Sequence, residues 1–226
     1  MPMPASNRYG TTRDRVEQYF DRTATTVWER LTSDAPVSRI RQTVREGRDR
    51  MRALMLQQLP ADLRGARVLD AGCGAGQMTA DLAARGADVT AVDISPALVD
   101  IARRRLPADH HSRVRFASGD MTADYGQQDY VIAMDSLIYY DTQDITDALH
   151  LLASRTREAV VFTVAPRTPF LMAFWGMGKL FPKSDRSPVM IPHHHATLNR
   201  VAEGRVTKAG RVARGFYISE CLEYRP

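Results

Sequence analysis

Short apolar runs alternate with helical segments through the middle of the chain, from residue 66 to residue 166. Runs of this kind, bounded by glycine, proline and acidic residues, are typical of strands that are buried on both faces of a sheet. The alternation favours a doubly wound, mostly parallel α/β sheet. The predicted strands are RVLDA (67–71), ADVTAVD (87–93), VRFASGD (114–120), DYVIAMD (129–135) and AVVFTVAP (159–166).

Two amphipathic helices are predicted ahead of the sheet. In the first helix, over residues 13–31, apolar residues recur at helical spacing. In the second helix, over residues 38–59, apolar residues form one stripe, and most of the arginines lie on the other faces. Pro60 ends the second helix. The stripes consist of Val16, Phe20, Val27 and Trp28, and of Ile40, Val44, Gly47, Met51 and Met55. We therefore expect an N-terminal helical arm (1–59) in front of the main domain (60–226).

The C-terminal segment has the alternation of an antiparallel hairpin. Residues 206–214 and 216–224 flank Gly215. In the second run the residues that alternate with their neighbours are Phe216, Ile218, Glu220, Leu222 and Tyr224. Before this hairpin, residues 167–210 form an insertion that contains the apolar stretch PFLMAFWGMGKLF (169–181). That stretch is shorter than the about 20 residues that a membrane-spanning helix needs.

Composition and charge narrow the choice of protein class. The chain has 226 residues and is 44% hydrophobic, which is enough for one large domain or one domain with an extension. Most of the net charge of +5 lies in the N-terminal quarter, which suits an anionic partner or simply a solvated helix surface. The two cysteines have no metal-site spacing. With no secretory signal at the N-terminus, we expect a cytoplasmic protein without a bound metal of its own.

The stretch VLDAGCGAGQ (68–77) predicts a ligand-binding turn after the first strand. Glycine at positions 72, 74 and 76 allows the backbone to approach a ligand where a Cβ would interfere. The dinucleotide fingerprint GxGxxG requires a third glycine where this chain has Gln77. The pattern therefore argues against a dinucleotide oxidoreductase.

Acidic residues follow four of the predicted strands. Ligands of doubly wound sheets bind at the carboxyl ends of the strands, so four carboxylates there indicate a site. Each of them taken alone is also a common helix cap. The four residues are Asp70, Asp93, Asp120 and Asp135.

The glycine turn resembles motif I of the class I S-adenosylmethionine-dependent methyltransferases, in which an acid precedes GxGxG. The resemblance implies that Gly72, Gly74 and Gly76, with Asp70, hold the methionine end of S-adenosylmethionine. The other assignments follow the family motifs in chain order. Asp93 and Ile94 hold the ribose, Asp120 and Met121 hold the adenine, and Asp135 completes the cofactor-binding set. The hairpin resembles the reversed seventh strand of this Rossmann-like fold.

The segment after the fourth predicted strand narrows the range of possible methyl acceptors. Amino-methylating enzymes that act on nucleic acid bases or glutamine typically carry (N/D/S)PP(Y/F) there, whereas this chain reads MDSLIYYDTQD (134–144). We therefore do not expect a nucleic acid substrate, although the N-terminal arm is basic.

Several further segments resemble the magnesium-protoporphyrin IX methyltransferases of chlorophyll and bacteriochlorophyll synthesis. They are VEQYFDRTATTVWERL (16–31), VREGRDRM (44–51), MDSLIYY (134–140), TVAPRTPFLMAFWGMGKLFPKSDRSPVMIPH (163–193) and RVARGFYISECLEYRP (211–226). The resemblance implies methyl transfer to a propionate of magnesium protoporphyrin IX, with magnesium present only in the substrate. It also implies the large subunit of magnesium chelatase as a partner. The hydrophobic substrate is compatible with peripheral attachment to the photosynthetic membrane.

The same resemblance implies roles for individual side chains. Arg45 or Arg48 pairs with a carboxylate of the substrate or of the cosubstrate, and the resemblance favours Arg45, unless these are ordinary exposed helix arginines. Tyr19 donates to a propionate, or else packs within its helix. Tyr139 lies where plant and cyanobacterial relatives have histidine, and it orients an acceptor oxygen.

The insertion supplies the remaining candidates. Phe174 and Trp175 form a wall for the macrocycle, dip into a membrane surface or belong to a core helix. Among the three adjacent histidines, which we expect to be exposed or capping, His193 is a candidate for an axial magnesium contact. Two other functions stay open, which are methylation of another small acid or quinone, and tetrapyrrole binding without turnover.

Overall fold

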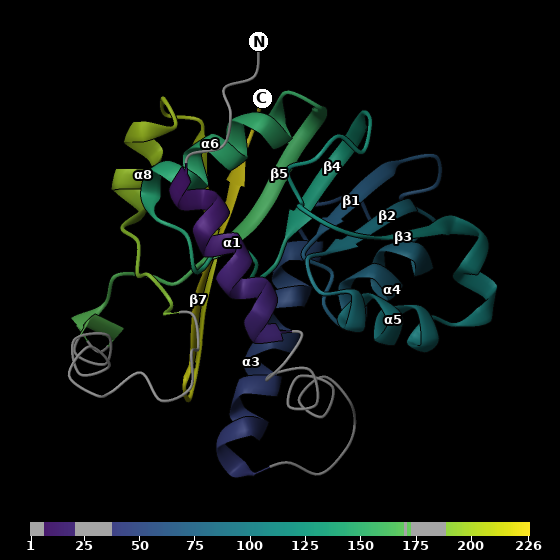
Figure 1. Ribbon diagram of the computed structural model, residues 1–226, viewed down its shortest axis with the longest axis horizontal. Coiled ribbons are helices and arrows are strands. Elements are labelled where there is room, and N and C mark those ends of the chain that lie inside the picture. Colours follow the sequence, from purple (N-terminus) through teal and green to yellow (C-terminus); the bar gives the residue numbers. More distant parts are fainter. Residues whose placement is uncertain (1–6, 21–37, 170, 173–188) are drawn as a thin grey trace.

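The computed structural model describes residues 7–20, 38–169, 171–172 and 189–226. Its centre is one seven-stranded sheet with the strand order β3-β2-β1-β4-β5-β7-β6 (Figure 1). The strands are β1 (Arg67–Ala71), β2 (Asp88–Asp93), β3 (Val114–Ser118), β4 (Gln128–Ala133), β5 (Thr156–Val164), β6 (Val206–Arg214) and β7 (Tyr217–Tyr224). The first five are parallel, and β7 runs antiparallel to both β5 and β6. The predicted sheet and hairpin are confirmed.

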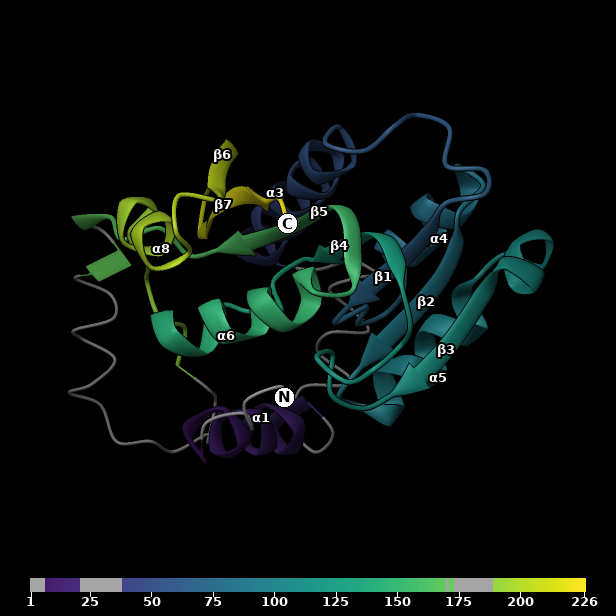
Figure 2. The same ribbon diagram turned by 90° about the horizontal axis from the view of Figure 1, so that it is seen from above.

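Helices cover the sheet because its central strands are apolar on both faces. On one face Leu69 and Phe162 join a buried cluster with α6 (Thr142–Ala153) and α8 (His195–Val201). On the other face Val68 and Ile132 join a cluster with α3 (Arg39–Leu56) and α4 (Gln77–Ala84). Neighbouring residues of one strand thus belong to different clusters, as the pleat requires. Figure 2 shows α6 and α3 on opposite sides of the sheet.

The helix α3 packs across the C-terminal hairpin. It begins after Ser38, whose side chain accepts a hydrogen bond from the N–H of Arg41, and it buries Gly47, Met51 and Met55. A Cβ at Gly47 would lie 2.7 Å from the Tyr217 side chain, so glycine at this position allows close contact between helix and strand. The predicted stripe is correct at these residues and wrong at Ile40, which is 57% exposed because it lies in the first turn.

Helix α1 (Asn7–Tyr19) begins six residues earlier than the first predicted helix. The remainder of that prediction, and the candidates Phe174 and Trp175, lie outside the described residues. The helix α5 (Pro96–Arg105) follows β2 at the ligand edge of the sheet, and the 3-10 helix η2 (Ala108–Arg113) leads into β3 at the opposite edge. Within the part of the chain that the structure describes, no helix is long and apolar enough to cross a membrane.

Candidate functional site

A pocket opens at the carboxyl ends of β1, β2, β3 and β4, and it contains about 1030 Å³ of space when the part open to solvent is counted. All four strand-end acids and all three motif residues from Gly72 to Gly74 line it. Residues of α1 and α3 line it as well, so segments before the sheet complete its wall. The predicted convergence of the four acids at one edge of the sheet is therefore confirmed.

The glycine turn is shaped by backbone conformation and by close contacts. Gly72 and Gly76 have φ angles of 86° and 85°, in the left-handed region. A Cβ at Gly72 would lie 2.5 Å from the Ser136 Cβ, and one at Gly76 would lie 2.8 Å from the Ala102 Cβ. The turn therefore brings bare backbone to the pocket, directly before the N-terminus of α4.

Asp70, at the end of β1, is almost completely buried, with 1% exposure. Its carboxylate accepts a hydrogen bond of 2.5 Å from Thr79 Oγ1, in the first turn of α4. Burial raises the pKa of Asp70 to about 7, and the charge of Asp93 adds to this rise, while the bonds from Thr79 oppose it. Near neutral pH Asp70 is therefore divided between its protonated and its ionised form.

Asp93, at the end of β2, joins the glycine turn to the following helix. Its two oxygens accept hydrogen bonds from the N–H of Gly74, at 2.8 Å, and from the N–H of Ser95, at 3.0 Å. The side chain of Ser95 in turn caps α5 by accepting from the N–H of Leu98. The carboxylate is thus oriented by two backbone donors at the pocket wall, beside Ile94.

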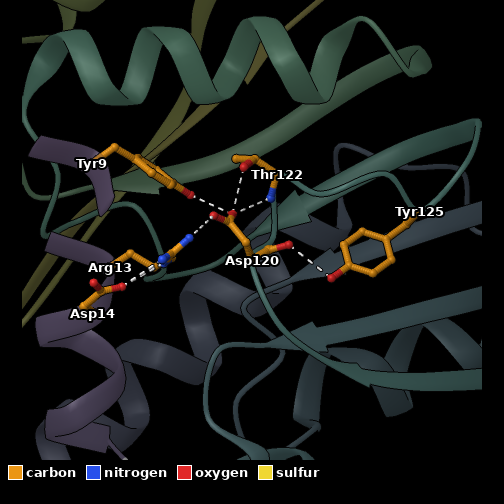
Figure 3. A network of polar contacts seen from close by, with 6 residues as sticks. All are labelled: Tyr9, Arg13, Asp14, Asp120, Thr122 and Tyr125. Atoms are coloured by element: carbon orange, nitrogen blue, oxygen red, sulfur yellow. Dashed lines mark hydrogen bonds and ion pairs between the residues drawn. The ribbon is translucent and has the colours of Figure 1, made fainter. Parts of the chain in front are cut away.

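Asp120, just after β3, is the centre of the polar network in Figure 3. Its Oδ1 accepts bonds of 2.8 Å from both the N–H and the hydroxyl of Thr122, and one of 2.9 Å from the Tyr9 hydroxyl. Arg13 Nη1 lies 3.3 Å from Oδ2. Burial raises the pKa of Asp120, but the bonds from Thr122, Tyr9 and Arg13 outweigh it, and the net shift is downward. Asp120 is therefore ionised at neutral pH.

Two of these partners, Tyr9 and Arg13, belong to α1 and were not among the site residues predicted from the sequence. The ring of Tyr9 stacks on Tyr140, with centroids 4.8 Å apart and planes inclined by 24°. Tyr9, Arg13, Val16 and Phe20 all line the pocket. Their spacing of four, three and four residues is that of one helix face. The signal was present in the sequence, but the predicted helix began at Arg13 and omitted Tyr9.

Asp135, two residues after β4, is bound by three other elements. Arg48 Nη1 of α3 lies 2.6 Å from Oδ2, and the Tyr217 hydroxyl of β7 donates to Oδ1 at 3.0 Å. Thr163 of β5 also donates to Oδ1, at 3.2 Å. The side chains of Arg48 and Asp135 are 17% and 9% exposed. Sequence reasoning included Asp135 and Arg48 separately and missed Tyr217 and Thr163, because nothing local in the sequence indicates which distant strands flank β4.

The two candidate catalytic tyrosines occupy different positions. Tyr139 lines the pocket, and burial followed by the nearby charge of Asp135 raises the pKa of its hydroxyl, which therefore stays protonated at neutral pH. Tyr19 does not line the pocket, and its ring lies edge-on to Phe20, whose ring is in turn 6.3 Å from that of Tyr139. Arg45 is half-buried on α3 and also lies outside the pocket lining.

His193 corrects one expectation from the sequence. It is buried, with 3% exposure, rather than exposed or capping. Its Nε2 lies 2.9 Å from the Tyr140 carbonyl oxygen and its Nδ1 lies 3.3 Å from Thr142 Oγ1. With both ring nitrogens engaged inside the protein, His193 is not available as an axial magnesium ligand. Its side chain instead fixes the residues after β4 to the segment that precedes α8, and its backbone forms a bridge with Pro166, after β5.

Comparison with known proteins gives matches along nearly the whole chain. Residues 133–226 match the family model "Magnesium-protoporphyrin IX methyltransferase C-terminus", and residues 68–158 match "Methyltransferase domain". The magnesium-protoporphyrin O-methyltransferase of Rhodobacter capsulatus is 63% identical over 96% of this chain and 98% of that protein.

Solved structures agree with this result. The crystal structure of magnesium protoporphyrin IX methyltransferase from Synechocystis PCC 6803 with bound SAH covers 95% of this chain and 100% of that chain, with a TM-score of 0.80 and 27% identity.

A second kind of relative matches a short part of the sequence. A ubiquinone biosynthesis O-methyltransferase of Xanthomonas oryzae pv. oryzae is 57% identical, but over only 19% of this chain and 18% of that protein.

The buried acid Asp70 generates a prediction about pH. Because its pKa in the folded chain, about 7, lies above the about 3.9 of an unfolded chain, the folded protein retains a proton that the unfolded chain has lost. Stability is therefore lost as the pH rises from about 4 to about 7. Asp70→Asn removes this dependence, so its stability relative to the unmodified chain should increase by up to a few kcal/mol between pH 5 and pH 8.

Urea unfolding at the two pH values measures this difference. The exposed Asp109→Asn serves as the control for the loss of one negative charge. An equal effect of Asp70→Asn at pH 5 and at pH 8 would contradict the raised pKa.

Proposed function

The chain belongs to the magnesium-protoporphyrin O-methyltransferase family, and from this premise we propose that it transfers a methyl group from S-adenosylmethionine to one propionate of magnesium protoporphyrin IX. The product is the monomethyl ester, an intermediate of bacteriochlorophyll synthesis. The observation that carries the proposal is the 63% identity to the Rhodobacter capsulatus enzyme over nearly both chains. Methylation of a quinone has weaker support, because the match to the ubiquinone enzyme covers only a fifth of the chain.

The residues of the pocket fit S-adenosylmethionine. The glycine turn has no space for side chains at Gly72 and Gly76, and the two oriented carboxylates Asp93 and Asp120 suit the ribose hydroxyls and the adenine amino group. Met121, which is buried in the pocket wall, suits the adenine ring. When bound, the cosubstrate supplies a methyl group on a positively charged sulfur. The four acids of the pocket favour that charge.

The acceptor needs orientation more than it needs a base. A propionate with a pKa of about 4.3 is already ionised at neutral pH. Orientation of reacting groups can lower a barrier by about 7 to 11 kcal/mol. Tyr139, whose hydroxyl stays protonated, is the pocket residue that we assign to donate to a propionate oxygen. Tyr19 then supports Phe20 and Tyr139 through its ring rather than donating to the substrate.

We propose that Arg48, rather than Arg45, offsets the negative charge of the methyl acceptor in the pocket. Arg48 lines the pocket and is held there by Asp135 at 2.6 Å, whereas Arg45 does not line it. A guanidinium at the wall lowers the cost of bringing a second carboxylate into a pocket that already contains four acids.

We further propose that the N-terminal arm, residues 1–59, acts as a lid, a role supported by its described helix α1. Its helix α1 covers the pocket with one face and contacts the sheet edge through Tyr9 and Arg13 (Figure 3). A helix of 13 residues is marginally stable alone, so its position depends on these contacts. Closure of such a helix over both substrates would exclude water from the reacting groups.

Attachment to a membrane surface has support from one end of the molecule. Ile40 and Phe216 are 57% and 54% exposed, and they belong to adjacent segments, because a Cβ at Gly215 would touch Thr43. The exposed arginines of these segments are Arg39, Arg41, Arg211 and Arg214. Apolar side chains beside cations suit anionic lipid headgroups. A complex with the large subunit of magnesium chelatase, which the family implies, is a separate hypothesis that co-purification of the two proteins tests.

The first prediction from this function concerns the acceptor. The purified chain should transfer labelled methyl from S-adenosylmethionine to magnesium protoporphyrin IX, and the label should be recovered as a porphyrin ester that alkali hydrolyses. Total RNA should remain unlabelled. Binding of both ligands without transfer would instead identify a tetrapyrrole-binding protein, and transfer to a quinone alone would identify the other acceptor class.

The lid predicts an effect of one hydroxyl. Tyr9→Phe keeps the ring on Tyr140 but removes the bond to Asp120, which is worth about 1 kcal/mol. Amide hydrogen exchange in α1 should become about fivefold faster. Tyr125→Phe is the matched control, because its hydroxyl donates to the backbone carbonyl of Asp120 from the opposite side and should leave α1 unchanged. Equal exchange of α1 in all three proteins would refute the lid contact.

The end of the molecule that exposes Ile40 and Phe216 is predicted to bind lipid. The chain should co-sediment with vesicles that contain anionic phospholipid and not with neutral ones, and Phe216→Ser with Ile40→Ser should reduce the bound fraction severalfold, since each buried apolar side chain contributes about 1.5 to 3 kcal/mol. Equal sedimentation of the double variant would mean that this end does not contact the lipid.

A further inference from the structure

The turn that follows β4 is held in an unusual conformation. Asp135 has a φ of 57°, in the left-handed region that residues other than glycine rarely adopt. Its N–H donates to Thr163 Oγ1 at 2.8 Å, and its carboxylate is bound by Arg48 and Tyr217. Backbone strain persists where surrounding contacts over-determine it, and it gathers at functional sites. These contacts therefore fix the position of the next residue, Ser136.

Ser136 has a polar atom that the protein does not satisfy. Its Oγ is buried and has no hydrogen-bond partner among the residues that the structure describes. It faces Gly72, where an added Cβ would lie 3.1 Å from Ser136 Oγ. The N–H groups of Gly72 and Cys73 are both directed to the Val92 carbonyl oxygen at 2.8 Å, so neither of them donates to the hydroxyl. Buried hydroxyl groups are paired in most proteins, and an unpaired one reduces stability.

The location of Ser136 indicates which part of a ligand it faces. Asp120 follows β3, Asp93 ends β2 and Ser136 follows β4, in a sheet whose order is β3-β2-β1-β4. With strands about 4.8 Å apart, Ser136 lies about 10 Å along the edge from the ribose acid and farther from the adenine acid. A nucleoside bound by those two acids would therefore direct its 5′ substituent across Gly72 toward Ser136.

We propose that the hydroxyl of Ser136 forms a hydrogen bond with the α-amino acid end of S-adenosylmethionine, an inference that rests on the proposed cosubstrate site. Ser136 already lines the pocket, and the proposed bond requires a rotation about χ1 that turns Oγ away from Gly72 to another staggered rotamer. The bond satisfies a group that is unpaired in the protein alone. Ser136 is thus a binding residue whose hydroxyl costs stability without the ligand and adds affinity with it.

The experiment compares two ligands by calorimetry with Ser136→Ala. S-adenosylhomocysteine carries the amino acid end, and 5′-methylthioadenosine has the same nucleoside without it. We expect about tenfold weaker binding of the first and a change below about twofold for the second. The melting temperature of the ligand-free variant should not fall and should rise by about 2 °C, because an unpaired buried group has been removed.

Asp93→Asn is the matched control, since loss of the ribose acceptor should weaken both ligands together. If Ser136 only supports the turn, Ser136→Ala will weaken both ligands equally and lower the melting temperature, which overturns the proposal. Unchanged affinity for both ligands, or an effect confined to the KM of the porphyrin, also overturns it. Failure of the unmodified chain to bind either ligand would reject the cosubstrate site itself.

Discussion

Four carboxylates meet at the carboxyl edge of one sheet, and the structure around the pocket depends on how each is bound. Like charges in a partly buried site repel, and an unpaired carboxylate there is costly. Each of the four acids is therefore stabilised in a different way. Asp70 has its pKa raised to about 7, Asp93 accepts two backbone N–H groups, and Asp120 and Asp135 recruit side chains from outside their own strands.

The side chains that bind Asp120 and Asp135 also position the N-terminal helices. Helix α1 is held to Asp120 by Tyr9 and Arg13, and α3 is held to Asp135 by Arg48. The two contacts differ in strength. The bond from Arg48 is short and little exposed, whereas Arg13 reaches Asp120 at 3.3 Å with 37% of its side chain exposed. Among the residues that the structure describes, α3 also packs on the hairpin, whereas α1 reaches the site through the bonds to Asp120 and the stacking of Tyr9 on Tyr140. The proposed lid requires a difference of this kind.

The sheet and the convergence of the four acids at its edge could be predicted from the sequence, but the side chains that bind those acids could not. The five parallel strands could be predicted because apolar runs of this length between helices have few other solutions, and the acids converge because parallel strands end at one edge. Tyr217 and Thr163 could not be found in this way. Thr163 contacts Asp135 because β5 pairs with β4, and Tyr217 contacts it because β7 pairs antiparallel with β5. No local pattern specifies these neighbours. His193 was misplaced for a similar reason, since its partners at Tyr140 and Thr142 lie some fifty residues away.

The segment after β4 shows how stability and binding are opposed in this pocket. Asp135 retains a strained φ and Ser136 retains an unpaired hydroxyl, and a protein selected for stability alone would have neither. Glycine at position 135 would relieve the strain, but it would remove the carboxylate that holds Arg48 and Tyr217. The turn therefore keeps one unfavourable feature that holds Arg48 and Tyr217, and a second that the proposed bond from Ser136 to the cosubstrate would relieve. Local conflicts of this kind, in a fold that is otherwise consistent with its sequence, are expected at sites of function.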